Sequence, residues 1–432
     1  MTLEDRIATL ALTAFSSLPT KCKPRPQEWI PMTAIILQTS DETLHLASLA
    51  TGSKCIPSTT LPKATGLILH DCHSEILALR GLNHFLLQDA HRILTNHDYQ
   101  SPYLIYNNNH NNNNVNNNDP ATPPFALHPS ISIHLFSTEP PCGDASMEFI
   151  ISAQEDPTPW SLPTTNENTP LPNNNTSITN TLLPGRSYFS TLSIVRRKPS
   201  RPDAPPTFSK SCTDKLTLKQ FTSTLSSISS IIILPTKQAY IKTLTVPFDK
   251  FNQEGYTRAF TSTPPNGRLS NILPHTIDVD IKDYSYTPLT PTPLSQSFTL
   301  KYPYSKPPPQ DTTTKASNIA TLYINHPETS PITEVLISGV KQGNAQLSTA
   351  RGDKKGSVVC RKRMWLFLRQ IVDLLAPSQH LDIKTKVENI KTYLELKDID
   401  INNTRGRIQM KHLVTGVLNG WGKNIGDDDW GL

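Results

Sequence analysis

Hydrophobic residues recur along the chain at two spacings, and each spacing predicts a different element. Apolar positions three or four residues apart predict an amphipathic helix over 5–18 and a buried helix over 73–90. Short apolar runs bounded by turn residues predict strands at 30–37, 44–50 and 131–137. The first third of the chain therefore alternates between helices and strands.

The remainder of the chain contains fewer signals of this kind. Apolar runs predict strands at 231–234, 240–246 and 335–340. Residues 357–376 and 382–397 are predicted to be helices, and both carry basic clusters. The C-terminal third is therefore expected to be mainly helical.

Three stretches interrupt the pattern. The first, at about 105–128, contains the asparagine tract 107–119, which cannot bury apolar surface and is expected to be disordered. The second, at about 155–184, is rich in Pro, Thr and Asn, and the third, at about 261–330, is weakly patterned. Because element signals resume on either side of each stretch, we interpret them as inserts in one domain that spans 1–432.

Composition and charge exclude several classes of protein. The chain has 38 Pro against 17 Gly, which argues against coiled coils and helical repeats. Its net charge of +5 permits a nucleic-acid partner. No apolar run approaches the roughly 18 residues of a membrane span, and the first residues are acidic where a targeting signal would be basic. We expect an intracellular protein, cytoplasmic or nuclear or both, with no membrane partner and no obligate protein partner.

Two short motifs place metal-binding residue types beside predicted helix starts. His73 and Glu75 form an H-x-E pair where the 73–90 helix begins, and Pro141-Cys142 follows the 131–137 strand. This is the H-x-E…P-C part of the zinc nucleobase deaminase signature. The usual signature has a second Cys three positions after the first, but position 145 is Ala. Cys212 is therefore the best candidate for the missing ligand.

The chemistry of such a site needs these residue types. One His and two Cys hold zinc, and the fourth position carries a water whose pKa the metal lowers. Glu75 is not a ligand; it takes the proton from that water and delivers it to the ring nitrogen and then to the leaving ammonia. The other cysteines are interpreted as structural thiols because no ligand spacing supports them; they are Cys22, Cys55, Cys72 and Cys360.

The motifs in this order resemble those of the RNA-editing adenosine deaminases. The matching segments are DCHSE (71–75), PCGDAS (141–146), SCTDK (211–215), LPTKCKP-x-x-x-EW (18–29), GSKCI (52–56) and SGVKQG (338–343). The resemblance implies a cytidine-deaminase-like α/β fold, in which helices flank a mixed central sheet and a helical region extends the C-terminal end. It also implies zinc held by His73, Cys142 and Cys212.

The first and last of these segments look more like the eukaryotic tRNA branch of the family. That resemblance implies conversion of adenosine to inosine in tRNA, at the adenosine 3′ of the anticodon in alanine tRNA. Two alternatives stay open: deamination of another structured RNA, and a non-catalytic RNA-binding protein that retains zinc.

The resemblance further implies a buried inositol hexakisphosphate. The residues that match its expected contacts are Lys54, Asp71, Arg80, Lys215, Arg361, Tyr393, Lys397, Lys411 and Trp421. Asp71 would connect Lys215 to the zinc. Two positions depart from the family pattern, since Leu79 and Leu218 stand where basic residues are expected, although Lys219 adjoins the second.

Three residues match expected substrate contacts. Ser53 stands where the family has a small hydroxyl residue near the substrate ribose. Arg197 and Lys198 belong to a basic stretch that could contact phosphates near the target base. A plain basic loop explains this stretch nearly as well.

Overall fold

The computed structural model describes residues 1–106, 122–153, 183–184, 191–198, 204–264, 267–277, 281, 283–308, 313–343, 352–418 and 420–432. The asparagine tract and nearly all of the 155–184 stretch lie outside these residues. Within the described residues, none of the helices combines the length and the apolar character that crossing a membrane requires.

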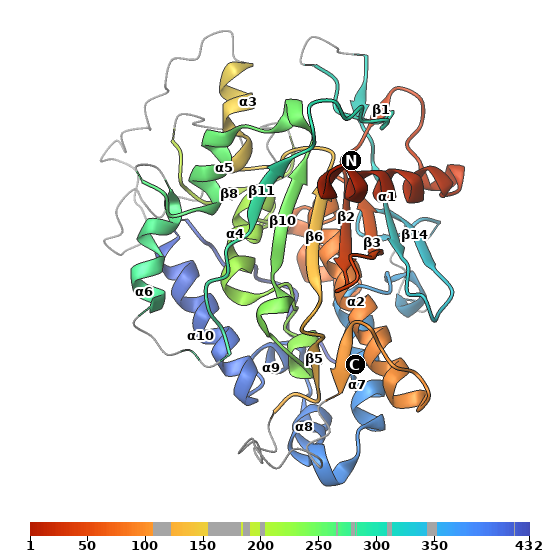
Figure 1. The fold of residues 1–432 in the computed structure, drawn as a ribbon. Helices are drawn as coiled ribbons and strands as arrows, with labels where there is room; N and C mark the ends of the chain where they lie inside the picture. Colours follow the sequence, from red (N-terminus) through yellow and green to blue (C-terminus); the bar gives the residue numbers. More distant parts are fainter. Residues whose placement is uncertain are drawn as a thin grey trace.

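A mixed eight-stranded sheet forms the centre of the molecule (Figure 1). Its strands, in spatial order, are β11 (Thr290–Pro293), β10 (Ile241–Val246), β6 (Ser132–Ser137), β2 (Met32–Gln38), β3 (Leu44–Thr51), β13 (Ile319–Ile324), β14 (Ile332–Ile337) and β15 (Val340–Lys341). β11, β10 and β6 run parallel to one another, and every other neighbouring pair is antiparallel. The predicted mixed α/β fold is confirmed.

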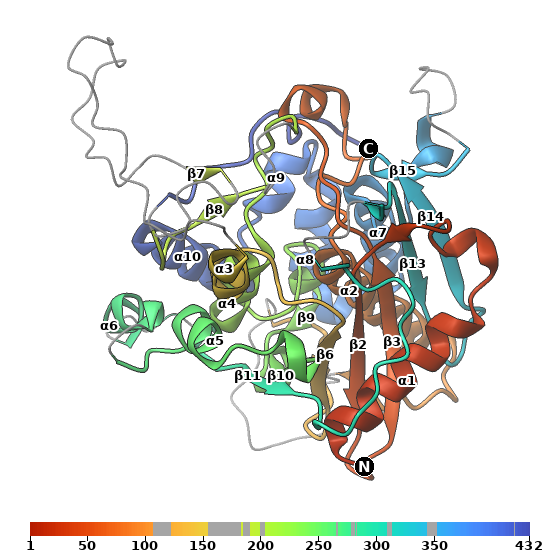
Figure 2. The same ribbon diagram turned by 90° about the horizontal axis from the view of Figure 1, so that it is seen from above.

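Strand β2 shows why helices cover both faces of this sheet. Its residues are almost all buried, and successive side chains point to opposite faces. Ile35 belongs to the same core as α2 (Ser74–Thr95), whereas Ala34 and Ile36 belong to the core formed by α1 (Leu3–Ser17). The two helices therefore lie on opposite sides of the sheet, as the view from above also shows (Figure 2).

Four helices follow the sheet near the C-terminal end of the chain: α7 (Arg361–Leu374), α8 (Pro377–Asn389), α9 (Tyr393–Lys397) and α10 (Asn402–Val417). The predicted 382–397 helix is divided into α8 and α9, because Thr392 caps a new helix by accepting a hydrogen bond from the Glu395 amide. α10 packs on α4 (Cys212–Thr222), and α7 packs on α2.

Smaller elements complete the described fold. They are β1 (Glu28–Trp29), β4 (Leu104–Tyr106), β5 (Phe125–Leu127), α3 (Met147–Ser152), β7 (Leu183–Pro184), β8 (Arg196–Arg197), β9 (Ile233–Leu234), α5 (Gln253–Phe260), α6 (Leu273–Ile277) and β12 (Lys315–Ala316). β4, β5 and β9 form a separate three-stranded sheet.

The stretch 261–330 differs from its interpretation as an insert. It contributes β11 to the edge of the main sheet and β13 to its interior, directly beside β3. Because β11 contains two prolines, its sequence does not predict a strand. An edge strand tolerates proline, since one side of its backbone needs no hydrogen-bond partner.

Candidate active site

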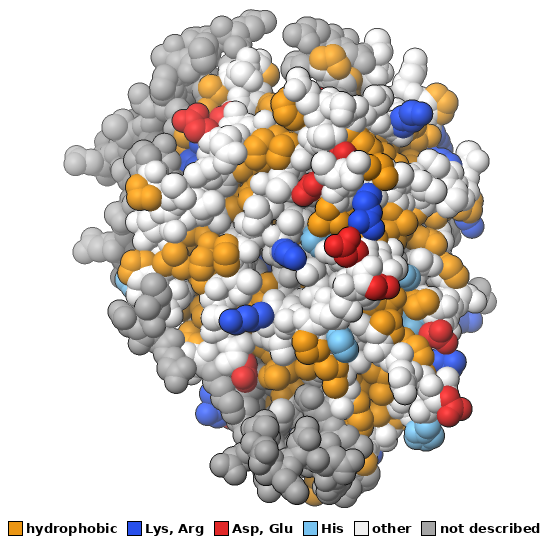
Figure 3. Space-filling model, in the orientation of Figure 1, with side chains coloured by type: hydrophobic (Ala, Val, Ile, Leu, Met, Phe, Trp, Pro, Cys, Tyr) orange, Lys and Arg blue, Asp and Glu red, His pale blue; other side chains and the backbone are white. Residues whose placement is uncertain are grey.

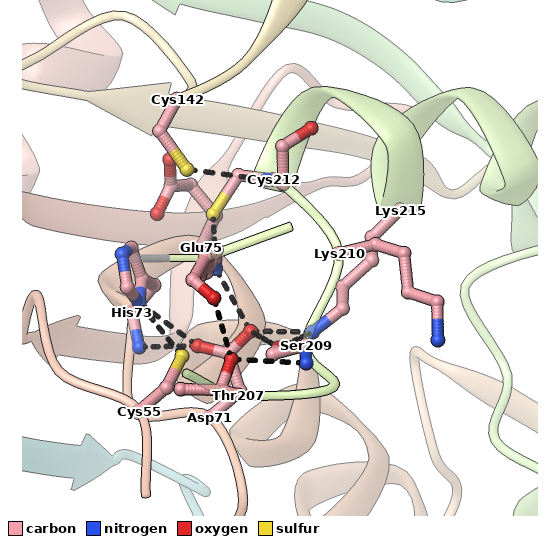
Figure 4. Close-up of polar contacts among 12 residues, drawn as sticks. Cys55, Asp71, His73, Glu75, Cys142, Thr207, Ser209, Lys210, Cys212 and Lys215 are labelled. Atoms are coloured by element: carbon pink, nitrogen blue, oxygen red, sulfur yellow. Dashed lines mark hydrogen bonds and ion pairs between the residues drawn. The ribbon is translucent and has the colours of Figure 1, made fainter. Parts of the chain in front are cut away.

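The three predicted metal ligands lie at the ends of three different elements. His73 is the N-cap of α2, Cys142 follows β6, and Cys212 is the first residue of α4. Figure 4 shows them gathered with Glu75 and Asp71. A helix N-terminus carries partial positive charge and stabilises a nearby thiolate or carboxylate. The fold therefore places Cys212 and Glu75 where negative charge is favoured.

Two hydrogen bonds join the turns that carry the two cysteines. The Cys212 amide donates to Cys142 Sγ at 3.3 Å, and the Thr213 amide donates to the Cys142 carbonyl at 3.0 Å. Gly143 lies between them with a φ of 107°, and a Cβ there would stand 2.2 Å from Ser211 Oγ. Glycine is therefore required at this point for the turns to approach each other.

Asp71 connects the histidine to a group of lysines. Its Oδ1 accepts from His73 Nδ1 at 2.9 Å, and its Oδ2 accepts from Lys198 Nζ at 2.8 Å and from Ser209 Oγ at 2.7 Å. Lys215 also donates to Oδ2. Burial alone would raise the pKa of Asp71, but Lys198, Lys215 and His73 outweigh it and hold this pKa well below its usual value. The surroundings of Asp71 therefore favour its charged form.

The surroundings of the two cysteines shift their pKa values in opposite directions. A hydrogen bond from Cys212, together with the charges of Lys198 and His73, holds the pKa of Cys142 well below its usual value despite burial. Burial and the neighbouring Cys142 thiolate raise the pKa of Cys212. Lys198 Nζ lies 3.2 Å from Cys212 Sγ. The site thus stabilises one thiolate and provides a cation beside the second thiol.

Glu75 lies in the first turn of α2 with 4% of its surface exposed. Burial, followed by the negative charge of Cys142, raises the pKa of its carboxyl group. Ser74 Oγ donates to Glu75 Oε2 at 3.2 Å. A carboxylate in such surroundings takes up a proton more readily than one in water, which suits a group that transfers protons.

A second set of donors surrounds the same histidine. Cys55, Asp71 and His73 place ligand atoms within 4.8 Å of one another in the described part of the chain, and Cys55 Sγ lies 3.6 Å from His73 Nδ1. An isolated backbone bridge between Cys55 and Asp71 brings this cysteine to the site. Its spacing in the sequence gave no indication of a ligand, because the bridge joins residues of different segments.

Lys198 corrects one expectation about substrate contacts. Its ammonium group is buried and bound to Asp71 and Cys212, so it is not available to a phosphate at the surface. Arg197 is half-buried and pairs through its backbone with Lys210. Ser53 Oγ is buried and has no hydrogen-bond partner within the described residues.

A cluster of cations lies beyond Asp71. Arg80, Arg407 and Lys411 act electrostatically on Lys219, and Arg407 also acts on Lys411. Burial, then Arg407, Lys411 and Arg80, hold the pKa of Lys219 well below its usual value. Burial, then Arg407 and Lys397, lower the pKa of Lys411 to about 8. Uncompensated cations this close repel one another, so their grouping points to an anionic ligand.

Other residues of the expected polyanion site border this cluster. Arg361 and Lys397 lie over the Tyr393 ring, at 5.3 and 5.7 Å from its centroid. Lys210 Nζ lies 5.8 Å from the centroid of Trp421. Arg80 donates to a main-chain carbonyl of the segment before α7 at 3.0 Å. The Lys54 side chain is half-buried, and its carbonyl accepts from the Cys72 amide at 2.9 Å.

Sequence reasoning missed three members of this region. Arg407 and Lys210 lie outside the motifs that carry the resemblance. Lys219 is singled out in the sequence only as the neighbour of Leu218. Lys219 donates to the carbonyls of Thr224 and Leu225 at 3.1 and 2.8 Å. Its charge interacts with that of Arg80, so this region has a cation on α4 although position 218 is Leu.

Comparison with known proteins places this geometry in a family. The model of the adenosine-deaminase (editase) domain matches residues 48–424. The chain belongs to that family. It is therefore an enzyme that deaminates adenosine, and the family implies a metal at the site.

Relatives of the deaminase family extend the match over almost the whole chain. The "tRNA-specific adenosine deaminase 1" of Schizosaccharomyces pombe is 32% identical over 98% of this chain and 95% of its own length. The protein of the same name from Saccharomyces cerevisiae is 31% identical over 62% of this chain and 64% of its own length. The mouse "Double-stranded RNA-specific adenosine deaminase" is 26% identical over 34% of this chain and 11% of its own length.

Proposed function

We propose that this deaminase acts on alanine tRNA. It removes the 6-amino group of the adenosine that lies 3′ of the anticodon by hydrolysis, which converts this adenosine to inosine. Support for tRNA comes from two relatives named as tRNA-specific deaminases, one of which matches 98% of this chain and the other 62%. The observation that carries the catalytic proposal is Glu75, a buried carboxyl with a raised pKa beside a histidine and a thiolate. A purely structural metal site has no need of such a group.

Zinc is the metal that this donor set fits best. Thiolate and imidazole ligands favour zinc over the harder cations magnesium and calcium. We propose that His73, Cys142 and Cys212 hold it. The low pKa of Cys142 and the proximity of Lys198 to Cys212 support two thiolate ligands, since Lys198 compensates the second negative charge. When bound, zinc lowers the pKa of a water molecule so that it can attack the adenine ring.

The protein side chains have separate tasks in this proposal. Glu75 accepts the first proton of the attacking water and gives it to the ring nitrogen; it then accepts the remaining hydroxyl proton and gives it to the 6-amino group, which leaves as ammonia. Asp71 fixes the orientation of the His73 ring by accepting from Nδ1. The target base has to leave its stack to reach this buried carboxyl, as in other nucleobase deaminases.

We further propose that the cation cluster binds inositol hexakisphosphate. Six phosphates would compensate the charges of Arg80, Lys219, Arg407 and Lys411, which otherwise repel one another in the interior. Lys215 joins this region to Asp71. The Lys and Arg side chains on the face shown in Figure 3 are scattered among other types.

Inositol hexakisphosphate is expected to stabilise the protein and to change how its stability depends on pH. Without a polyanion, Lys411 binds more protons in the unfolded chain than in the folded one between its lowered pKa of about 8 and its usual value of about 10.4, so its contribution to stability rises with pH in this window. Bound phosphates favour the charged form of Lys411 and raise its pKa toward the usual value. The melting temperature should then depend less on pH. At 100 times its Kd the ligand should add about 2.7 kcal/mol of stability.

Thermal unfolding between pH 7 and 10, with and without the ligand, measures both effects. Unphosphorylated inositol is the control and should change nothing. A melting temperature that the ligand does not raise, or a dependence of melting temperature on pH that is the same with and without the ligand, would contradict the polyanion site.

The substrate proposal is tested with purified protein and a panel of RNAs. Transcripts of alanine tRNA, of a second tRNA and of a long RNA duplex are incubated with the enzyme and then sequenced, because inosine is read as guanosine. The expected result is a change next to the anticodon of alanine tRNA alone. Editing of the duplex instead would move the activity to another structured RNA, and binding without editing of any RNA would favour a non-catalytic role.

A further inference from the structure

Each proposed cysteine ligand is followed two residues later by a buried aspartate. Asp144 follows Cys142, Asp214 follows Cys212, and neither carboxylate has exposed surface. Burying a carboxylate is very unfavourable unless a cation and hydrogen bonds compensate it. The two turns that carry the cysteines therefore depend on whatever binds these aspartates.

An arginine compensates each carboxylate. Arg258 of α5 lies 3.2 Å from Asp144 Oδ2 through Nε and donates to the Asp144 carbonyl at 2.7 Å. It also pairs with Glu148. Arg268, in the turn Arg268–Asn271, lies 2.7 Å from Asp214 Oδ1 and also donates to Thr217. Both arginine side chains are almost fully buried.

The two arginines lie ten residues apart in the sequence, and hydrogen bonds connect the Arg258–Asp144 pair to the Arg268–Asp214 pair. Arg268 Nε donates to the carbonyl of Ala259, the residue after Arg258, at 2.9 Å. The Leu269 amide donates to the Thr261 carbonyl at 3.2 Å. Arg258, Ala259 and Arg268 therefore connect the turn of Cys142 to the turn of Cys212.

The charges of this network balance. Its acidic members are Asp144, Glu148 and Asp214, and its basic members are Arg196, Arg258 and Arg268. The network therefore brings no net charge to the site. What it fixes directly is the position of the two backbone turns.

We propose that Arg258 and Arg268 are positioning residues of the metal site. By holding Asp144 and Asp214, they fix the separation between the thiols of Cys142 and Cys212. The inference rests on the proposed assignment of these cysteines as zinc ligands. Groups that orient metal ligands typically contribute about 10- to 100-fold to metal affinity.

Arginine-to-lysine substitutions test the proposal, because they keep the charge and remove the planar fork. In Arg258→Lys and in Arg268→Lys the zinc Kd, measured by competition with a chelator, should rise about 10-fold or more. The absorption band of the Co²⁺-substituted protein that arises from thiolate coordination should shift or weaken. Glu148→Gln, which removes a more exposed partner of Arg258, is a milder variant and should raise the Kd less.

Two controls separate positioning from general loss of stability. Arg405→Lys makes the same substitution in the exposed pair that Arg405 forms with Asp400. Asp89→Asn removes a buried carboxylate bound to His326, about 24 Å along α2 from His73 by the helix rise. Neither should change the zinc Kd or the cobalt band.

The outcomes distinguish this inference from the proposed function. A zinc Kd within twofold of the native value in both arginine variants, with an unchanged cobalt band, would overturn the positioning role. Native protein that binds no zinc would instead overturn the metal assignment on which the role rests. A loss of affinity in Asp89→Asn equal to that in Arg258→Lys would show that the effect is general destabilisation.

Discussion

Replacing Glu75 by glutamine is expected to lower kcat for adenosine deamination by about 10²- to 10⁴-fold. The amide has nearly the same shape as the carboxylate and can still accept a hydrogen bond from Ser74. It cannot take up a proton from water and deliver it to the ring. Single-turnover rates on the edited tRNA, measured together with zinc content and tRNA binding, check this expectation. Zinc content and tRNA binding should stay near their native values.

The matched control is Glu334→Gln. Glu334 is another buried carboxylate. It belongs to β14 and accepts hydrogen bonds from the Ser357 hydroxyl and the Val358 amide, and within the described residues it contacts none of the proposed zinc ligands. Its substitution should leave kcat within a few-fold of native. A Glu75→Gln protein that keeps more than a tenth of native kcat would remove Glu75 from the proton-transfer role.

Replacing Cys212 by serine is expected to abolish stoichiometric zinc binding and reduce deamination to background. A hydroxyl is a far poorer zinc ligand than a thiolate, because it does not ionise at neutral pH. Metal analysis of the purified protein and the editing assay measure the two effects. Cys142→Ser should behave in the same way.

Two further serine variants decide between the possible donor sets. Cys360→Ser changes a fully buried thiol at the start of α7 and should retain zinc. Cys55→Ser changes the thiol that lies 3.6 Å from His73 Nδ1. We expect it to retain zinc too. If Cys55→Ser loses zinc and Cys212→Ser keeps it, the ligands are Cys55, Asp71 and His73, and the proposed set is wrong.

Local sequence patterns were sufficient to predict the elements that hold the site. The apolar spacing located α2, the run before Cys142 located β6, and the cap residues lie where those patterns end. They were not sufficient for β13, which lies in the interior of the sheet, because its apolar run is enclosed by Pro- and Thr-rich segments. Only pairing with a strand distant in sequence makes this segment a core element.

The same distinction applies to individual residues of the site. Motifs identify His73, Glu75 and the two cysteines, because their chemistry needs fixed residue types at fixed positions. The surroundings of Lys198 depend on tertiary contacts, so a basic stretch that is typical of a solvated loop is instead buried against Asp71. Arg407 lies on a helix, where charged residues usually face water, and only packing brings it beside Lys219.

The position of β13 also bears on how the chain folds as it is made. Thr321 donates its amide to Thr51 across 270 residues of sequence. At typical rates of synthesis, β13 leaves the ribosome roughly 14–54 s after β3. During that interval the nascent β2–β3 hairpin has a free edge of backbone donors and acceptors, which is a template for pairing with other chains. Newly made protein should therefore depend on chaperones during this window.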